Sequence, residues 1–135
     1  MRALAALLLL AACATTQATP PERLAGCWIE RSNLGGAETM RWLPDGSGGL
    51  RGDLLRYGTS GVTGRESYTL RAQAAGFALC QTGANETCWS VAQGDGGSLE
   101  GGRAFIDSYG ESLRISVVDS RGQRVIFQGR RDGCD

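Results

Sequence analysis

The chain has 135 residues, enough for one domain, and its 14 basic and 14 acidic side chains give zero formal net charge. Nucleic acids select clustered positive charge, so this balance predicts no nucleic-acid partner. The sequence contains no histidine and no lysine, and every basic side chain is arginine. Arginine stays protonated at working pH and cannot serve as a general base. The absence of histidine and lysine excludes a histidine-based triad, a histidine metal site and a lysine Schiff base.

The N-terminal segment has the pattern of a secretory signal. Met1-Arg2 is positively charged, and Ala3 to Ala12 is a run of alanine and leucine that is too short to cross about 30 Å of hydrocarbon. The ending Leu10-Ala11-Ala12-Cys13 resembles the lipobox of bacterial lipoproteins. This resemblance implies cleavage of residues 1–12, lipidation of Cys13, and a membrane partner held through the lipid anchor. An ordinary signal with a chance cysteine, or a buried helix, would share the pattern.

The segment after Cys13 is predicted to be a lipidated tether over residues 13–21. It is small, polar and proline-ended, which favours a flexible chain. Alanine follows the cysteine where lipoproteins retained at the inner membrane usually carry aspartate, so the family rule favours the periplasmic face of the outer membrane in a bacterial cell envelope. We expect the folded domain to cover residues 22–135.

Short alternating segments fill this domain and predict strands. Leu113 to Val117 alternates apolar and polar residues with period two, and similar runs lie at Tyr68–Ala72, Phe77–Cys80, Trp89–Val91 and Val125–Gln128. Glycine-rich turn signals separate them, among them 45–46, 83–85, 95–97, 101–102 and 121–122. The pattern predicts an all-β fold, an antiparallel meander closed as a barrel or folded as a sandwich. The segment 70–79 could also be helical, but Gly76 argues against that.

Four cysteines remain after Cys13, and an even number in a small secreted domain predicts two disulfides among three possible pairings. Alternation places Cys80 and Cys88 on the same outer face of a hairpin, within disulfide reach, which predicts Cys80–Cys88. Cys27–Cys134 then joins the first and last strands, which are neighbours in a closed up-and-down barrel. A Cys₄ zinc site is an alternative, although the spacings lack the usual short knuckles.

A family resemblance enters at Gly26-Cys27-Trp28. The Gly-x-Trp pattern is similar to the opening motif of lipocalins and related calycin barrels, and residues 24–55 resemble small bacterial lipocalin-like domains of unknown function. The resemblance implies a small antiparallel up-and-down barrel of roughly 8 strands. It also implies that Gly26 and Trp28, the two fixed positions of the motif, lie at one barrel end. Trp28 would close that end, and an arginine of the last strand, Arg130 or Arg131, would pack over its ring.

Two functions follow as hypotheses, and both are non-catalytic. The first is a lipocalin-like carrier of a small apolar ligand or envelope component, with a cavity lined by Trp42, Tyr68, Phe77 and Trp89, although these aromatics serve equally as packed core. The second is a protein-binding module, such as a periplasmic inhibitor of lysozyme or of a protease, with the polar, glycine-rich segment from Arg56 to Glu66 as its protruding loop.

The chain carries no recognisable catalytic set, so we expect neither an enzyme nor a cofactor or metal. Without histidine or lysine nothing obvious activates a serine, and no spacing singles out a pair of carboxylates. Alternation does allow Glu30 and Glu38 to point inward and pair with an arginine such as Arg130, but both could equally lie in water at strand ends.

Overall fold

The computed structural model describes residues 19–92 and 102–134. The signal segment, Cys13 and the tether up to residue 18 lie outside this range, as does the turn expected at 95–97. The elements are α1 (Pro20–Leu24), β1 (Gly26–Arg31), β2 (Ala37–Pro44), β3 (Leu50–Gly58), β4 (Gly61–Gln73), β5 (Gly76–Thr82), β6 (Thr87–Val91), β7 (Arg103–Tyr109), β8 (Ser112–Asp119) and β9 (Gly122–Asp132). Within these two ranges, no helix is long and apolar enough to cross a membrane.

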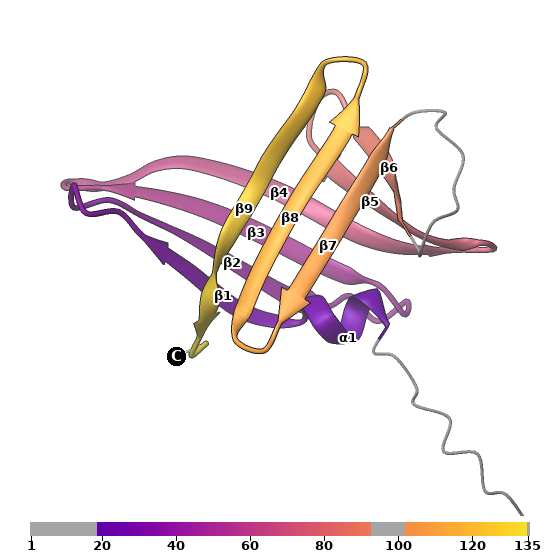
Figure 1. Cartoon of the computed structure of the whole chain (residues 1–135), viewed down its shortest axis with the longest axis horizontal. Helices are drawn as coiled ribbons and strands as arrows, with labels where there is room; N and C mark the ends of the chain where they lie inside the picture. Colours follow the sequence, from indigo (N-terminus) through magenta and orange to yellow (C-terminus); the bar gives the residue numbers. More distant parts are fainter. Residues whose placement is uncertain (1–18, 93–101, 135) are drawn as a thin grey trace, which may run out of the picture.

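The strands close into one barrel in chain order, and β9 pairs with β1 (Figure 1). The expected all-β barrel is confirmed, but residues 19–92 and 102–134 form nine strands rather than roughly eight, and one junction is parallel. β6 and β7 run in the same direction and pair only at Ser90–Arg103 and Val91–Ala104. Parallel strands cannot be joined by a two-residue hairpin, so this junction departs from the expected antiparallel meander.

The region from Arg56 to Glu66 was expected to be a loop, and that expectation was wrong. β3 and β4 continue through it as paired strands, and only Thr59 and Ser60 form the turn. β4 begins at Gly61, whose φ of +121° is a backbone conformation that glycine adopts readily and other residues rarely do. Figure 1 shows this hairpin and the β1–β2 turn extending side by side at one end of the molecule.

The barrel interior holds one continuous hydrophobic core. All three tryptophans, Trp28, Trp42 and Trp89, are at most 2% exposed. Gly52 lies under the ring of Trp42, because an added Cβ would stand 2.6 Å from the indole. Alternation along each strand sends these apolar residues inward and the polar residues between them outward.

Helix α1 and Trp28 close the barrel end at which β1 begins. The side chain of Thr19 caps the helix through the backbone N–H of Glu22. The Trp28 indole Nε1 donates to the carbonyl oxygen of Leu24 at 2.9 Å. The guanidinium of Arg131, not Arg130, stands 4.2 Å from the Trp28 ring centroid and donates to the carbonyl of Ala25.

The resemblance left Arg130 and Arg131 open for this position; the structure contradicts Arg130 and selects Arg131, and the reason is strand parity. Trp28 pairs with Arg131 across the β1–β9 junction, while Arg130 pairs with Ile29 and points outward. Gly26 does lie at this barrel end, where a Cβ at its position would stand 2.7 Å from the Arg131 guanidinium.

Both predicted disulfides are present. Cys27–Cys134 joins the first strand to the chain end that follows β9, across 107 positions of sequence. Cys80–Cys88 joins directly paired residues of β5 and β6. The wall is thus fastened covalently at the β1–β9 junction and within the β5–β6 hairpin.

Candidate functional site

The four aromatic residues expected to line a ligand cavity belong to the packed interior. Trp42, Tyr68 and Trp89 are buried members of the core cluster, and Phe77 is partly buried against it. Trp42 and Tyr68 lie with ring centroids 6.4 Å apart. Neither of the two surface grooves described below is lined by any of the four. Their contacts are those of core packing.

A polar network occupies the opposite barrel mouth, away from α1. Arg56 lies between two carboxylates, donating from Nε to Glu38 at 3.0 Å and from Nη1 to Glu66 at 3.2 Å. The Tyr68 hydroxyl donates to Glu66 at 2.8 Å. Glu38 does point inward as alternation allowed, but its partner is Arg56 on the neighbouring strand and not Arg130. In this network the charges of Arg56, Glu38 and Glu66 compensate one another where the β3–β4 hairpin leaves the barrel.

The pKa values in this network fit a structural role. Burial raises the pKa of Glu66, but hydrogen bonds from Arg56 and Tyr68 outweigh it and hold that pKa below its ordinary range. Burial and the Glu66 hydrogen bond raise the pKa of Tyr68 well above normal. A general acid needs a carboxyl group with a raised pKa, and Glu66 is displaced the other way.

The pKa of Asp119, at the turn between β8 and β9, is also lowered. The indole N–H of Trp89 donates to its carboxylate at 3.0 Å, followed by the backbone N–H of Arg121 and the guanidinium of Arg124. These donors lower the pKa of Asp119 to about 2. The carboxylate thereby fastens the β8–β9 turn to β6 and stays ionised at working pH.

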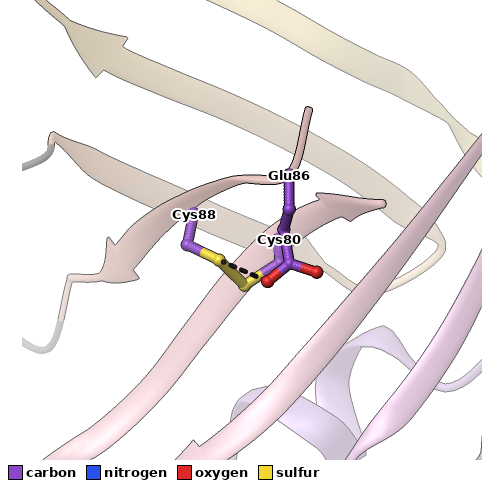
Figure 2. Close-up of side chains that lie close together, drawn as sticks. All are labelled: Cys80, Glu86 and Cys88. Atoms are coloured by element: carbon purple, nitrogen blue, oxygen red, sulfur yellow. Dashed lines mark hydrogen bonds between the residues drawn. A yellow bond between two sulfur atoms is a disulfide. The ribbon is translucent and has the colours of Figure 1, made fainter. Parts of the chain in front are cut away.

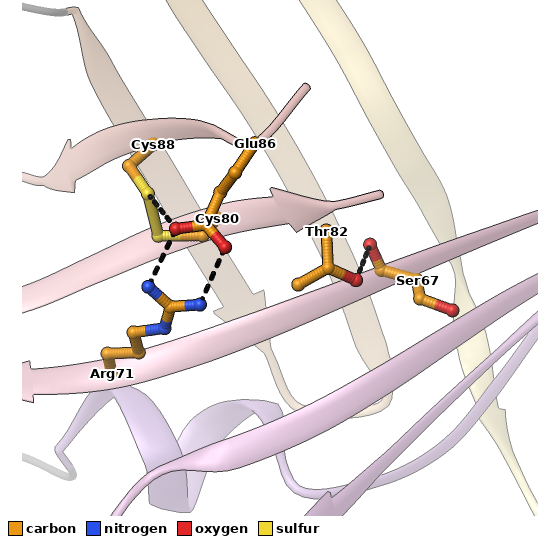
Figure 3. The surroundings of a disulfide bond; sticks show 6 residues. All are labelled: Ser67, Arg71, Cys80, Thr82, Glu86 and Cys88. Carbon is orange, nitrogen blue, oxygen red and sulfur yellow. Dashed lines mark hydrogen bonds and ion pairs between the residues drawn. A yellow bond between two sulfur atoms is a disulfide. The ribbon is translucent and has the colours of Figure 1, made fainter. Parts of the chain in front are cut away.

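Figure 2 shows Cys80, Glu86 and Cys88 close together, with one potential ligand atom from each within 4.8 Å of the others. The two sulfur atoms are bonded to each other, and Cys88 Sγ lies 3.6 Å from the Glu86 carboxylate. Arg71 on β4 holds Glu86 through two hydrogen bonds of 2.8 and 2.9 Å (Figure 3). These groups are engaged with one another, so the cluster covers the disulfide rather than offering an open metal site.

Three apolar side chains are exposed where the two neighbouring turns project. Leu34 in the β1–β2 turn is 91% exposed, Val62 on β4 is 51% exposed, and Tyr57 on β3 is 36% exposed. Tyr57 pairs with Val62, and the glycines of the β1–β2 turn approach Tyr57 and Thr59. We refer to Leu34, Tyr57 and Val62 as the arm tip. It gathers apolar surface on the projecting end of a barrel whose interior is packed.

A groove of about 930 Å³ runs over β1, β9, β8 and β7. Its outer-face residues form two cross-strand rows. The first row is Ile29, Arg130, Ser112 and Tyr109, and the second contains Gln128, Arg114 and Asp107. Arg31 continues β1 along the same groove. We call this surface the β9 groove.

A smaller pocket of about 430 Å³ lies over the outer face of β1 to β4, beside the Cys27–Cys134 disulfide. Arg41, Arg51 and Arg65 surround Asp53, which accepts a hydrogen bond from the Ser67 hydroxyl. Arginine is thus the main charged component of both surfaces.

Comparison with known proteins places the chain in no group: no family model, no curated protein and no solved structure matches it. The closed β-barrel stands on the structure alone, and the lipocalin-like identity has no further support.

Sequence reasoning named the Arg56–Glu66 segment, which carries Tyr57 and Val62 of the arm tip, but it missed Leu34 and the β9 groove. The arm tip carried a weak signal, since Leu34 stands alone between polar residues and glycines in a turn. The groove arises from pairing between β9 and both β1 and β8, which brings together residues far apart in the sequence.

Proposed function

We propose that this protein is a non-catalytic binding module of the bacterial cell envelope, anchored by lipid at Cys13, that recognises another protein through its arm tip. An inhibitor of a lysozyme or a protease is the class that fits best. The observation that carries the proposal is the arm tip itself: three exposed apolar side chains, Leu34 in the β1–β2 turn and Tyr57 and Val62 at the paired ends of β3 and β4, on the part of the molecule that projects from a filled barrel. Exposed apolar side chains gathered on one projecting part of a protein favour an interaction site there.

The packed interior favours this function over the apolar carrier. A ligand in the expected position would have to displace Trp42, Tyr68 or Trp89, each at most 3% exposed. Cores pack at crystal-like density, and opening one for a ligand costs several kcal/mol. The arm tip requires no such rearrangement, and its aromatic and aliphatic side chains are suited to fill a partner's cleft.

The placement of the arm tip agrees with an anchored binding module. β1 begins beside α1, at the end where the chain arrives from Cys13, and leads directly to the turn that carries Leu34. In Figure 1, α1 and the projecting turns lie on different sides of the barrel. An anchor preceding α1 would leave the arm tip facing away from the membrane.

Photo-crosslinking in producing cells tests the proposal. A benzophenone amino acid replaces Leu34, and the matched control replaces Val125, an exposed apolar residue on β9. We expect one discrete protein adduct from position 34 and none from 125. The isolated partner should then bind Leu34→Ser at least tenfold more weakly than the unchanged protein. Lipid adducts at position 34, equal adducts at both positions, or a co-purifying lipid in native mass spectrometry would refute the proposal.

Lipidation is tested separately by mass. The membrane fraction should contain a chain that begins at Cys13 and carries added acyl mass, and Cys13→Ser should abolish that species. A chain cut elsewhere without acyl mass would exclude the anchor and leave the arm-tip proposal standing on its own experiment.

A further inference from the structure

The β9 groove holds three guanidinium groups without a carboxylate partner. Within the ranges that the structure describes, Arg31, Arg114 and Arg130 form no ion pair, although Asp107 is the direct cross-strand neighbour of Arg114. By contrast, Arg56, inside the barrel mouth, is paired with two carboxylates. Arg41, Arg51 and Arg65, over β1 to β4, likewise form no ion pair among the described residues, so the β9 groove is one of two outer surfaces that carry such donors.

The three arginines lie on neighbouring strands along the same groove. Arg130 on β9 is paired with Ile29, and Arg114 on β8 is paired with Gln128, two residues before Arg130. Arg31 lies two residues beyond Ile29 on β1, along the same side of the groove. Two carboxylates, Asp107 and Glu30, also line the groove. The groove therefore has more arginines than carboxylates, even when Arg131, which stacks on Trp28, is left out.

Apolar surface lies beside these donors. Ile29 lines the groove, and Tyr109 lines it with 82% of its surface exposed. Tyrosine and arginine together are typical of the energetically important residues of protein interfaces. A guanidinium binds a carboxylate through two parallel hydrogen bonds, which gives direction as well as charge complementarity.

We propose that the β9 groove binds an acidic peptide segment, whose carboxylates pair with Arg31, Arg114 and Arg130 while its backbone or apolar side chains lie on Ile29 and Tyr109. The inference rests on the proposed protein-binding function and names the charge of the partner. β1 carries both Ile29 and Arg31 and leads into the turn with Leu34, so a partner on the arm tip extends naturally across the groove.

The test uses the full chain with Cys13→Ser and an end-blocked hexaglutamate peptide as probe, in low salt. We expect saturable binding that weakens with added salt and falls at least tenfold in Arg114→Gln with Arg130→Gln. The matched control is Arg41→Gln with Arg51→Gln, which removes equal charge from the other arginine surface. That control should stay within twofold of the starting affinity.

Each other outcome overturns the proposal. No saturable binding, or equal losses in the groove variant and its control, would reduce the effect to net charge. Tighter binding of polyphosphate than of hexaglutamate at the same arginines would assign the groove to a phosphate polymer. Leu34→Ser should leave hexaglutamate affinity unchanged, so failure of the groove and failure of the arm tip are observed separately.

Discussion

The two disulfides close loops of very different length, so removing one or the other should lower the free energy of unfolding by different amounts. Cys27–Cys134 spans 107 positions and Cys80–Cys88 spans 8. In the chain-entropy description, the long bond destabilises the unfolded state by about 4.8 kcal/mol and the short one by about 2.5 kcal/mol. Replacing each pair by alanine should therefore cost roughly twice as much at the β1–β9 junction as in the hairpin.

Urea unfolding measures this difference directly. With a denaturant slope of about 2 kcal/mol per molar, the midpoint should fall by about 2.4 M for the junction pair and about 1.2 M for the hairpin pair. Trimethylamine N-oxide extends the titration if the junction variant is already unfolded in buffer. Cys80 is 1% exposed and Cys27 is 9% exposed, so lost packing works against the expected order. An equal or larger loss for the hairpin pair would refute the entropic reasoning.

Three further substitutions test single contacts. Arg131→Gln should lose about 1 kcal/mol of unfolding free energy in urea titration, because it removes the cation over an indole ring, whereas Arg130→Gln should be neutral; equal effects would contradict the parity assignment. Gly52→Ala places a Cβ 2.6 Å from the buried indole of β2 and should cost about 1–3 kcal/mol, while Gly64→Ala, whose nearest neighbours are at 3.6 Å, should cost far less. Asp119 has its pKa lowered to about 2, so it adds stability above its ordinary value of 3.8 that is lost as pH falls through 2. Asp119→Asn should flatten the urea midpoint between pH 5 and pH 2, and an unchanged pH profile would exclude this contribution.

Local patterns predicted the wall of the barrel well. Period-two alternation placed strands at Leu113–Val117 and Tyr68–Ala72, and it put Cys80 and Cys88 on the same face, where they are bonded. Gly76 breaks the segment that could have been helical, and β5 begins there with a positive φ. These features depend on neighbouring residues alone, which is why the sequence carries them.

Features that depend on pairing between distant strands were harder to predict. The parallel β6–β7 junction and the continuation of β3 and β4 through Arg56 need partners that no local pattern specifies. Arg56 looked like a loop residue because its two carboxylate partners, Glu38 and Glu66, lie on other strands. Sequence reasoning left Arg130 and Arg131 both open, and alternation could have decided between them: counting in steps of two from Phe127, a buried residue, reaches Arg131 and passes over Arg130.

The pairing of β9 with β1 makes this barrel suitable for circular permutation. β9 ends next to where β1 begins, and Cys27 is already bonded to Cys134. A short linker there, with new termini opened between β6 and β7, would give the order β7-β8-β9-β1-β2-β3-β4-β5-β6. Every consecutive pair in that order is antiparallel. The permuted chain would thus run as an uninterrupted meander, with the parallel contact left as its closing step.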